Sequence, residues 1–217
     1  ALGFERVDSR PSPEWLRRRL YYLGLGSKNS LVDLSNYIML DTGQPNHFFD
    51  ADKIEGNKLQ VRFARAGESL ELLVGGSIEL STSDIVVADA IKPVALAGIM
   101  GGLNCSVTED TTRIIVESAN FDATAIRLST KRHNLRTDAS NRFEKSPSPD
   151  CTGLAVARAV SLIGSVFPSS DVLGGVADVY PQPEIAREIT TTVDYIRGRL
   201  GNGPSDDEVR AILTSLK

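Results

Sequence analysis

The chain has 217 residues, 41% of them hydrophobic, which is enough for one large domain with an apolar core, or one domain and part of another. Its 24 basic and 28 acidic residues give a net charge of −4, which excludes a protein that binds nucleic acid through overall positive charge. Any contact with nucleic acid must therefore be local.

The first part of the chain predicts two helices. The segment Pro11-Ser12-Pro13 precedes an apolar-spaced run and predicts a helix over 13–23 that Ser12 caps. Apolar residues at 31, 32, 34, 37, 38 and 40 predict a second helix over 31–40, which ends before the Gly43-Gln44-Pro45 turn.

The middle of the chain predicts a sheet-rich core. Short apolar runs separated by Gly, Asp, Ser or Pro predict a β-meander, with strands at 59–63, 70–72, 78–80 and 85–87. We expect further strands at 94–99 and 114–117 and helices at 122–132 and 150–164, with Asp122 as an N-cap. The fold class is therefore α+β, with a β-sheet or sandwich core and flanking helices.

The C-terminal part predicts a separate, smaller module. Tyr180-Pro181-Gln182-Pro183 is the best linker, because two prolines in three residues oppose both helix and central strand. Beyond it we expect a strand at 188–193 and helices at 194–200 and 205–216, the last with a capping box of Ser205 and Glu208. We therefore divide the chain into domains at 1–180 and 186–217, the second being the start of a truncated small helical module.

Cysteine use and hydropathy predict the compartment. Cys105 and Cys151 stand outside any paired-cysteine motif, which fits a reducing compartment better than a disulfide scaffold. No run approaches the roughly 18 to 20 apolar residues of a membrane span, and the N-terminus lacks a signal-peptide pattern. We expect a cytoplasmic protein without a membrane segment. The start at Ala1 and the end within a helical pattern at Lys217 predict a piece of a longer protein.

Charge is unevenly distributed along the chain. Residues 113–145 contain seven Lys or Arg and four acids, whereas residues 50–89 contain four bases and eight acids. One face could therefore attract phosphates while another repels them. The alternative is an ordinary solvated surface of mixed charge.

Few residues offer catalytic chemistry by themselves. His47 lies between a Gly-Gln-Pro turn and two phenylalanines, and it is either a structural histidine or a functional one. Glu117 ends an apolar run, so its carboxylate faces either solvent or a polar partner inside a pocket. The glycines of 98–102 lack the Lys-Ser/Thr ending of a P-loop, and they indicate close backbone approach to a strand or a ligand. Two His and two Cys without ligand spacing predict no metal site.

Four short motifs occur in a fixed order. They are Asn36-Tyr37 with Gly43-Gln44-Pro45-Asn46-His47, then Gly98-Ile99-Met100-Gly101-Gly102, then Glu117-Ser118-Ala119, then Arg136-Thr137-Asp138-Ala139-Ser140. Together they resemble the editing domain in the β chain of bacterial phenylalanyl-tRNA synthetase. The resemblance covers roughly residues 11–175, and the tail from about 186 is similar to the beginning of the next β-chain domain. Each motif is weak alone, but their order and spacing are specific.

The resemblance implies a function. In that family the α chain attaches phenylalanine to its tRNA with ATP and magnesium, and this β-chain region hydrolyses tyrosine wrongly attached to the same tRNA. The implied partners are tRNA(Phe), tyrosine in the pocket and the α chain in an α2β2 heterotetramer, with no cofactor in this segment. The implied site residues are His47 beside the scissile ester, Glu117 on the ring hydroxyl, Gly101 leaving room for the aminoacyl group, and Thr137, Ala139 and Asn29 lining the pocket.

Two departures from the family pattern leave alternatives open. The family usually has Arg-Pro where this chain has Gly26-Ser27, and Arg-Gly-Val-Asp where it has residues 145–148. The first departure removes a cation that could contact the terminal adenosine of the tRNA. One alternative is a scaffold or tRNA-binding module of the same subunit without hydrolysis, and another is an unrelated α+β small-molecule binder. A pocket shared by His47, Gly101, Glu117 and Ala139 would favour hydrolysis, and a closed one would favour the scaffold.

Overall fold

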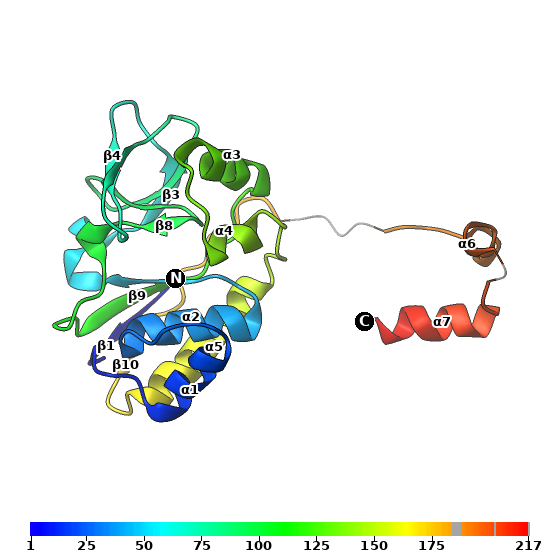
Figure 1. Cartoon of the computed structure of the whole chain (residues 1–217), viewed down its shortest axis with the longest axis horizontal. Coiled ribbons are helices and arrows are strands. Elements are labelled where there is room, and N and C mark those ends of the chain that lie inside the picture. Colours follow the sequence, from blue (N-terminus) through cyan, green and yellow to red (C-terminus); the bar gives the residue numbers. More distant parts are fainter. Residues whose placement is uncertain (184–187, 202, 217) are drawn as a thin grey trace. The chain divides into compact units, whose positions relative to one another are not determined.

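The computed structural model describes residues 1–183, 188–201 and 203–216, which form two compact units, Ala1–Asp178 and Val179–Lys217. In the first unit, helices cover one side of a sheet and a second sheet lies on its other side (Figure 1). This arrangement confirms the α+β class. Within the described residues, no helix is long and apolar enough to cross a membrane.

The first sheet has four antiparallel strands in the order β10-β1-β9-β2. These strands are β1 (Leu2–Glu5), β2 (His47–Asp50), β9 (Arg113–Glu117) and β10 (Asp171–Leu173). Only β9 was predicted from the sequence. The other three are three or four residues long and pair with strands far away in the chain, so their short patterns carried little signal.

The two faces of the first sheet belong to different cores. The helices α1 (Glu14–Tyr22), α2 (Ser30–Thr42) and α5 (Cys151–Val166) pack on one face, where Ile114 and Val116 of β9 are buried among them. Because successive side chains in a strand point to opposite faces, Ile115 and Glu117 of β9 lie on the other side. Ile115 and Phe49 there pack into the second core.

The second core lies between the first sheet and a second four-stranded sheet of order β3-β6-β7-β8. Its strands are β3 (Gln60–Phe63), β6 (Ile85–Ala88), β7 (Pro93–Leu96) and β8 (Met100–Gly101), beside a hairpin of β4 (Ser69–Glu71) and β5 (Ser77–Glu79). The helices α3 (Ala123–His133) and α4 (Asp138–Phe143) lie beside this sheet (Figure 1). The β-meander is confirmed, but the strand predicted at 94–99 is too long, because β7 ends at Leu96 and residues 97–99 form a turn before β8.

Helix caps follow short-range rules. Asp122 caps α3 as predicted, and its carboxylate accepts a hydrogen bond from the Ala125 N–H at 2.7 Å. The prediction that Ser12 caps α1 is wrong. Pro13 is the N-cap without a side-chain bond, because the Ser12 hydroxyl donates instead to the buried carboxylate of Asp33.

The second unit contains α6 (Val193–Leu200) and α7 (Asp206–Ser215). The capping box of Ser205 and Glu208 is present as predicted. The strand predicted at 188–193 is wrong, because Thr192 caps α6 and Val193 already begins that helix. The predicted domain start at 186 lies outside the described residues. Among the described residues of this unit only Val209 is buried, so the unit has almost no core of its own.

The first core gives a stability prediction. Leu34 of α2 is fully buried in it, so Leu34→Ala should lower the free energy of unfolding by about 2 to 5 kcal/mol. Leu128→Ala removes the same atoms from a side chain that is 51% exposed and should cost less than about 1 kcal/mol. Urea denaturation followed by circular dichroism measures both. Equal losses would contradict the placement of Leu34.

Candidate functional site

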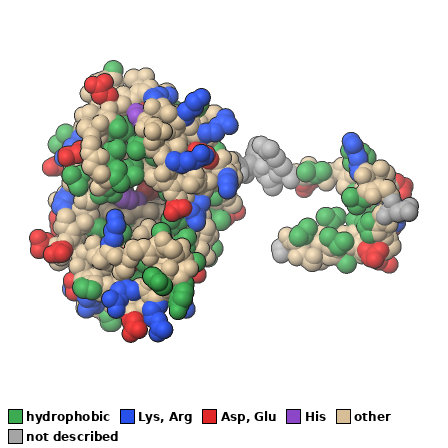
Figure 2. Space-filling model, viewed as in Figure 1, with side chains coloured by type: hydrophobic (Ala, Val, Ile, Leu, Met, Phe, Trp, Pro, Cys, Tyr) green, Lys and Arg blue, Asp and Glu red, His purple; other side chains and the backbone are tan. Residues whose placement is uncertain are grey.

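A cavity of about 70 Å³ opens between the two sheets of the first unit. By the same measure about 10 to 15 Å³ accommodates one water, so the cavity has room for several waters or a small organic group. Figure 2 shows a hollow on this unit with histidine atoms in its wall. The lining residues are Pro45, Asn46, His47, Val87, Ala95, Leu96, Ala97, Gly98, Ile99, Met100, Gly101, Glu117, Phe121, Ala139 and Phe143.

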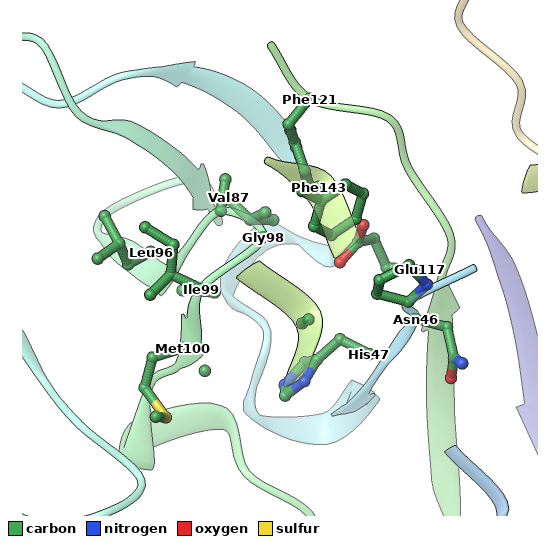
Figure 3. A pocket seen from close by; sticks show the side chains of 15 residues that line it. Asn46, His47, Val87, Leu96, Gly98, Ile99, Met100, Glu117, Phe121 and Phe143 are labelled. Carbon is green, nitrogen blue, oxygen red and sulfur yellow. The ribbon is translucent and has the colours of Figure 1, made fainter. Parts of the chain in front are cut away.

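The pairing of β2 with β9 places His47 directly opposite Glu117. Residues opposite each other in an antiparallel pair share a face of the sheet, so both side chains project toward the second sheet. Figure 3 shows them on one side of the cavity, across from Leu96, Ile99 and Met100. Two residues 70 positions apart in sequence thus form one polar wall.

His47 is a neutral imidazole at physiological pH. Desolvation by burial lowers its pKa from 6.5 to about 4. Its ring packs edge-to-face against Phe49, with centroids 4.5 Å apart. The buried Nε2 has no hydrogen-bond partner among the described residues. Nε2 can therefore bond a water or ligand atom in the cavity, as donor or acceptor according to the tautomer.

Glu117 is the acidic group of the same wall. Desolvation by burial raises the pKa of its carboxyl group from 4.5 to about 7. Within the described residues this carboxyl group forms neither a hydrogen bond nor an ion pair. An unpartnered carboxyl group beside an apolar cavity favours a ligand that carries a hydrogen-bond donor.

The rest of the cavity lining is apolar and aromatic. Phe121 and Phe143 pack edge-to-face with centroids 5.2 Å apart, and Val87, Leu96 and Ile99 lie beside them. Figure 3 shows the Glu117 carboxyl group on the side of the cavity where the two phenylalanines lie. Such a combination suits a flat apolar ring with a polar group at its edge.

Two glycines of the Gly98–Gly102 segment are required by close packing. A Cβ at Gly101 would lie 2.6 Å from Cε1 of His47, and Gly98 has a φ of +66° and would meet Phe143 at 2.8 Å. Close approach to a neighbouring strand and close approach to a ligand, the two alternatives that the sequence left open, therefore occur at the same place. The backbone approaches side chains closely, and those side chains line the cavity.

The structure brings four of the six predicted site residues together. His47, Gly101, Glu117 and Ala139 line the cavity. Thr137 is not itself a lining residue. Its hydroxyl donates to the carbonyl of the lining residue Ile99 at 3.0 Å and also caps α4. Asn29 is not among the lining residues either. Its side-chain oxygen accepts from the Val32 N–H at 2.9 Å and caps α2.

Sequence reasoning missed the aromatic wall. Phe143 lies four residues after Ala139, so both project from one side of α4, a helix that was not predicted. The signal was available in Thr137 and Ser140, which form the capping box of this helix. Within the described residues, no group of three or more His, Cys, Asp or Glu could hold a metal ion.

The loop that departs from the family pattern is held by local bonds. The Ser27 hydroxyl and the Lys28 N–H both donate to the Asp33 carboxylate, the second at 2.8 Å. Gly26 and Ser27 line a separate surface groove beside α1 rather than the cavity described above. The missing arginine of this loop therefore leaves the cavity wall unchanged.

Comparison with known proteins gives one consistent result. The B3/4 domain family matches residues 3–168. The chain is 41% identical over 216 residues to the phenylalanine–tRNA ligase β subunit of Solibacter usitatus (strain Ellin6076), covering 100% of this chain and 28% of the relative. The same subunit from Geobacillus kaustophilus (strain HTA426) is 41% identical over 215 residues, with 98% and 26% covered. That from Geobacter metallireducens (strain ATCC 53774 / DSM 7210 / GS-15) is 42% identical over 207 residues, with 95% and 26% covered. The chain thus spans about a quarter of the length of these relatives.

The raised pKa of Glu117 predicts a pH-dependent stability. Between pH 4.5 and about 7 the folded protein keeps a proton that the unfolded chain has lost, so the free energy of unfolding falls as pH rises through this window. Glu117→Gln removes this contribution. The variant should therefore gain about 1 to 3 kcal/mol relative to the unmodified protein between these limits, less than the full shift because the side chain is partly exposed.

Comparing the two proteins at each pH is necessary because His47 acts in the opposite direction. Its lowered pKa makes stability rise with pH between about 4 and 6.5, and this term is common to both proteins. Urea denaturation at half-unit steps of pH provides the measurement. A stability difference that stays constant with pH would show that Glu117 titrates normally.

Proposed function

Since the chain belongs to the B3/4 domain family and matches a segment of phenylalanine–tRNA ligase β subunits along its length, we propose that its cavity hydrolyses tyrosine wrongly esterified to tRNA(Phe). The observation that carries the proposal is the meeting of His47, Gly101, Glu117 and Ala139 around one open cavity. Its wall is apolar and aromatic, and it includes one carboxyl group without a partner.

The need for such a site follows from the chemistry of the two amino acids. Tyrosine differs from phenylalanine by one hydroxyl group, and an apolar synthetic site rejects an added hydroxyl by only about a hundredfold. A second site that hydrogen-bonds this hydroxyl discriminates against the analogue lacking it by about 10⁴-fold or more. In our proposal the phenol donates to the Glu117 carboxylate while the ring lies against Phe121 and Phe143.

The reaction is the hydrolysis of an ester. A water oxygen attacks the carbonyl carbon, the bond from that carbon to the ribose oxygen breaks, and the ribose oxygen takes up a proton. Free tyrosine and an uncharged tRNA result. We assign His47 a position beside the ester, where its neutral imidazole orients water or the ester through Nε2, and orientation supplies most of the acceleration. Gly101 leaves room for the imidazole in this position.

The remaining properties of the whole protein are part of the same proposal. We propose that the longer subunit works in phenylalanine–tRNA ligase, in tRNA aminoacylation and protein biosynthesis, together with an α chain. ATP and magnesium serve the synthetic site on that chain, and the compartment is the cytoplasm. This segment itself does not aminoacylate.

The proposal is tested by hydrolysis of tyrosine-charged tRNA(Phe) by the complete enzyme that carries this segment. We expect rapid release of tyrosine and slow release of phenylalanine. Glu117→Ala removes the acceptor for the ring hydroxyl and should reduce the preference for tyrosine over phenylalanine by at least about a hundredfold. Release is measured with radiolabelled amino acid under single-turnover conditions.

The control for this experiment is Glu109→Ala, which removes an exposed carboxylate away from the cavity lining and should leave the preference unchanged. If the unmodified enzyme leaves tyrosine attached at the spontaneous rate, the segment is a scaffold or tRNA-binding module instead. An unchanged preference in Glu117→Ala would remove the role assigned to that residue.

Gly101 gives a second, steric prediction. The methyl group of Gly101→Ala would meet His47 at 2.6 Å and Leu73 at 2.8 Å, so it should displace the imidazole and lower the rate of tyrosine release by about tenfold or more. Gly153→Ala in α5 meets no atom within 4 Å and is the matched control. Hydrolysis at the normal rate in Gly101→Ala would contradict the position proposed for His47.

A further inference from the structure

Positive charge is concentrated on α3, on α4 and on the short segments just before and after α4. Between residues 123 and 145 there are six Lys or Arg and two acids, in a chain whose net charge is −4. The six are Arg127, Lys131, Arg132, Arg136, Arg142 and Lys145. The positive segment expected from the sequence is therefore concentrated on two helices.

Three of these cations form ion pairs with acidic residues of the protein. Arg132 bonds the buried carboxylate of Asp84, Arg136 pairs with Glu144 at 2.9 Å, and Arg142 lies 3.6 Å from Asp138. These three cations are therefore partly neutralised within the protein.

The other three cations are free to bind a ligand. Arg127, Lys131 and Lys145 are exposed, and no ion pair or side-chain hydrogen bond engages them within the described part of the chain. Arg127 and Lys131 are four residues apart on α3 and therefore share one face of that helix. We call Arg127, Lys131 and Lys145 the basic surface.

The basic surface belongs to segments that line the cavity or pack against its lining. Ile126, next to Arg127, packs within 3.0 Å of the Cβ position of Gly98, and α4 contributes Ala139 and Phe143 to the lining. Lys145 follows Phe143 by two residues. Figure 2 shows Lys and Arg side chains over α3 and α4 beside the hollow. Positive side chains of this region are therefore close to the hollow into which an ester could enter.

A second basic cluster on α1 lacks this relation to the cavity. Arg17 and Arg18 lie on α1, whose buried residues Leu16 and Leu20 pack in the first core. That core is on the face of the first sheet opposite the cavity. The α1 cluster therefore serves as a comparison surface of similar charge.

We propose that the basic surface binds the phosphates of the single-stranded 3′ end of the RNA whose esterified terminus enters the cavity. This inference rests on the proposed function, and it adds a surface and a direction of approach. An aminoacyl ester is attached to a polyanion, so a carboxyl-lined cavity needs cations beside its mouth to hold the strand. The cations attract the backbone, while the Glu117 wall selects the side chain.

The test measures binding of a 5′-fluorescein-labelled RNA minihelix with a single-stranded CCA end to the 217-residue chain by fluorescence anisotropy. The test variant is Arg127→Glu/Lys131→Glu/Lys145→Glu. The control is Arg17→Glu/Arg18→Glu/Lys28→Glu, which changes net charge by the same amount at the α1 cluster and at the exposed Lys28 in the loop after α1. Circular dichroism melts establish that both variants fold, and the corresponding Gln variants repeat the test without charge reversal.

We expect the test variant to weaken binding at least about tenfold at low salt and the control by no more than about threefold. With three phosphate contacts the slope of log Kd against log salt should be about 2 for the unmodified chain and close to zero for the test variant. Equal weakening by the two variants, an unchanged Kd in the test variant, or no binding by the unmodified chain would overturn the inference.

Hydrolysis separates this inference from the proposed function. In the complete enzyme the test variant should raise the KM for tyrosine-charged tRNA(Phe) while kcat at saturation stays within about twofold, because the basic surface does not touch the ester. A chain that binds the minihelix through the basic surface but releases no tyrosine would refute the hydrolase and keep the surface. Normal release of tyrosine by the test variant, with an unchanged KM, would refute the role of the basic surface and keep the hydrolase.

Discussion

The antiparallel pairing of β2 with β9 is the constraint on which the site depends. It sets His47 opposite Glu117, and the alternation of side chains along both strands decides which core each residue joins. Phe48 and Val116 enter the first core with the helices, whereas His47 and Glu117 reach the cavity. A shift of β2 by one residue along β9 would move His47 into the helix-covered core and away from Glu117. The first core therefore protects the geometry of the site, because its apolar residues fix the register.

The same apolar surroundings adjust both titratable groups of the site. Burial lowers the pKa of His47 and raises that of Glu117, so near neutral pH the imidazole is uncharged and the carboxyl group is close to its midpoint. A salt bridge between them would have fixed both charges and occupied both groups. Because each is left without a protein partner among the described residues, the hydrogen-bonding capacity of the wall remains available to a ligand. This availability lowers stability and is typical of functional sites.

The aromatic part of the cavity lining is held by the short helix α4 and by Gly98. Thr137 joins α4 to the Ile99 carbonyl, and Gly98 allows Phe143 of that helix to pack against the backbone. Displacement of α4 would therefore change the aromatic wall and the adjoining positive charge together. Selection of a side chain and attraction of a phosphate strand are thus linked through one structural element in our proposal.

The sequence by itself determined the helices with strong periodicity and caps, the β-meander, and the ordered motifs that contain His47, Gly101, Glu117 and Ala139. These signals are local, because capping and amphipathic spacing involve residues within about four positions of each other. The tertiary structure decided that β1, β2 and β10 form one sheet with β9, that Phe121 and Phe143 form the aromatic wall, and that Asn29 and Thr137 act as caps. Pairing of short strands that lie far apart in the chain depends on the burial of both sheet faces, a property that no single segment carries.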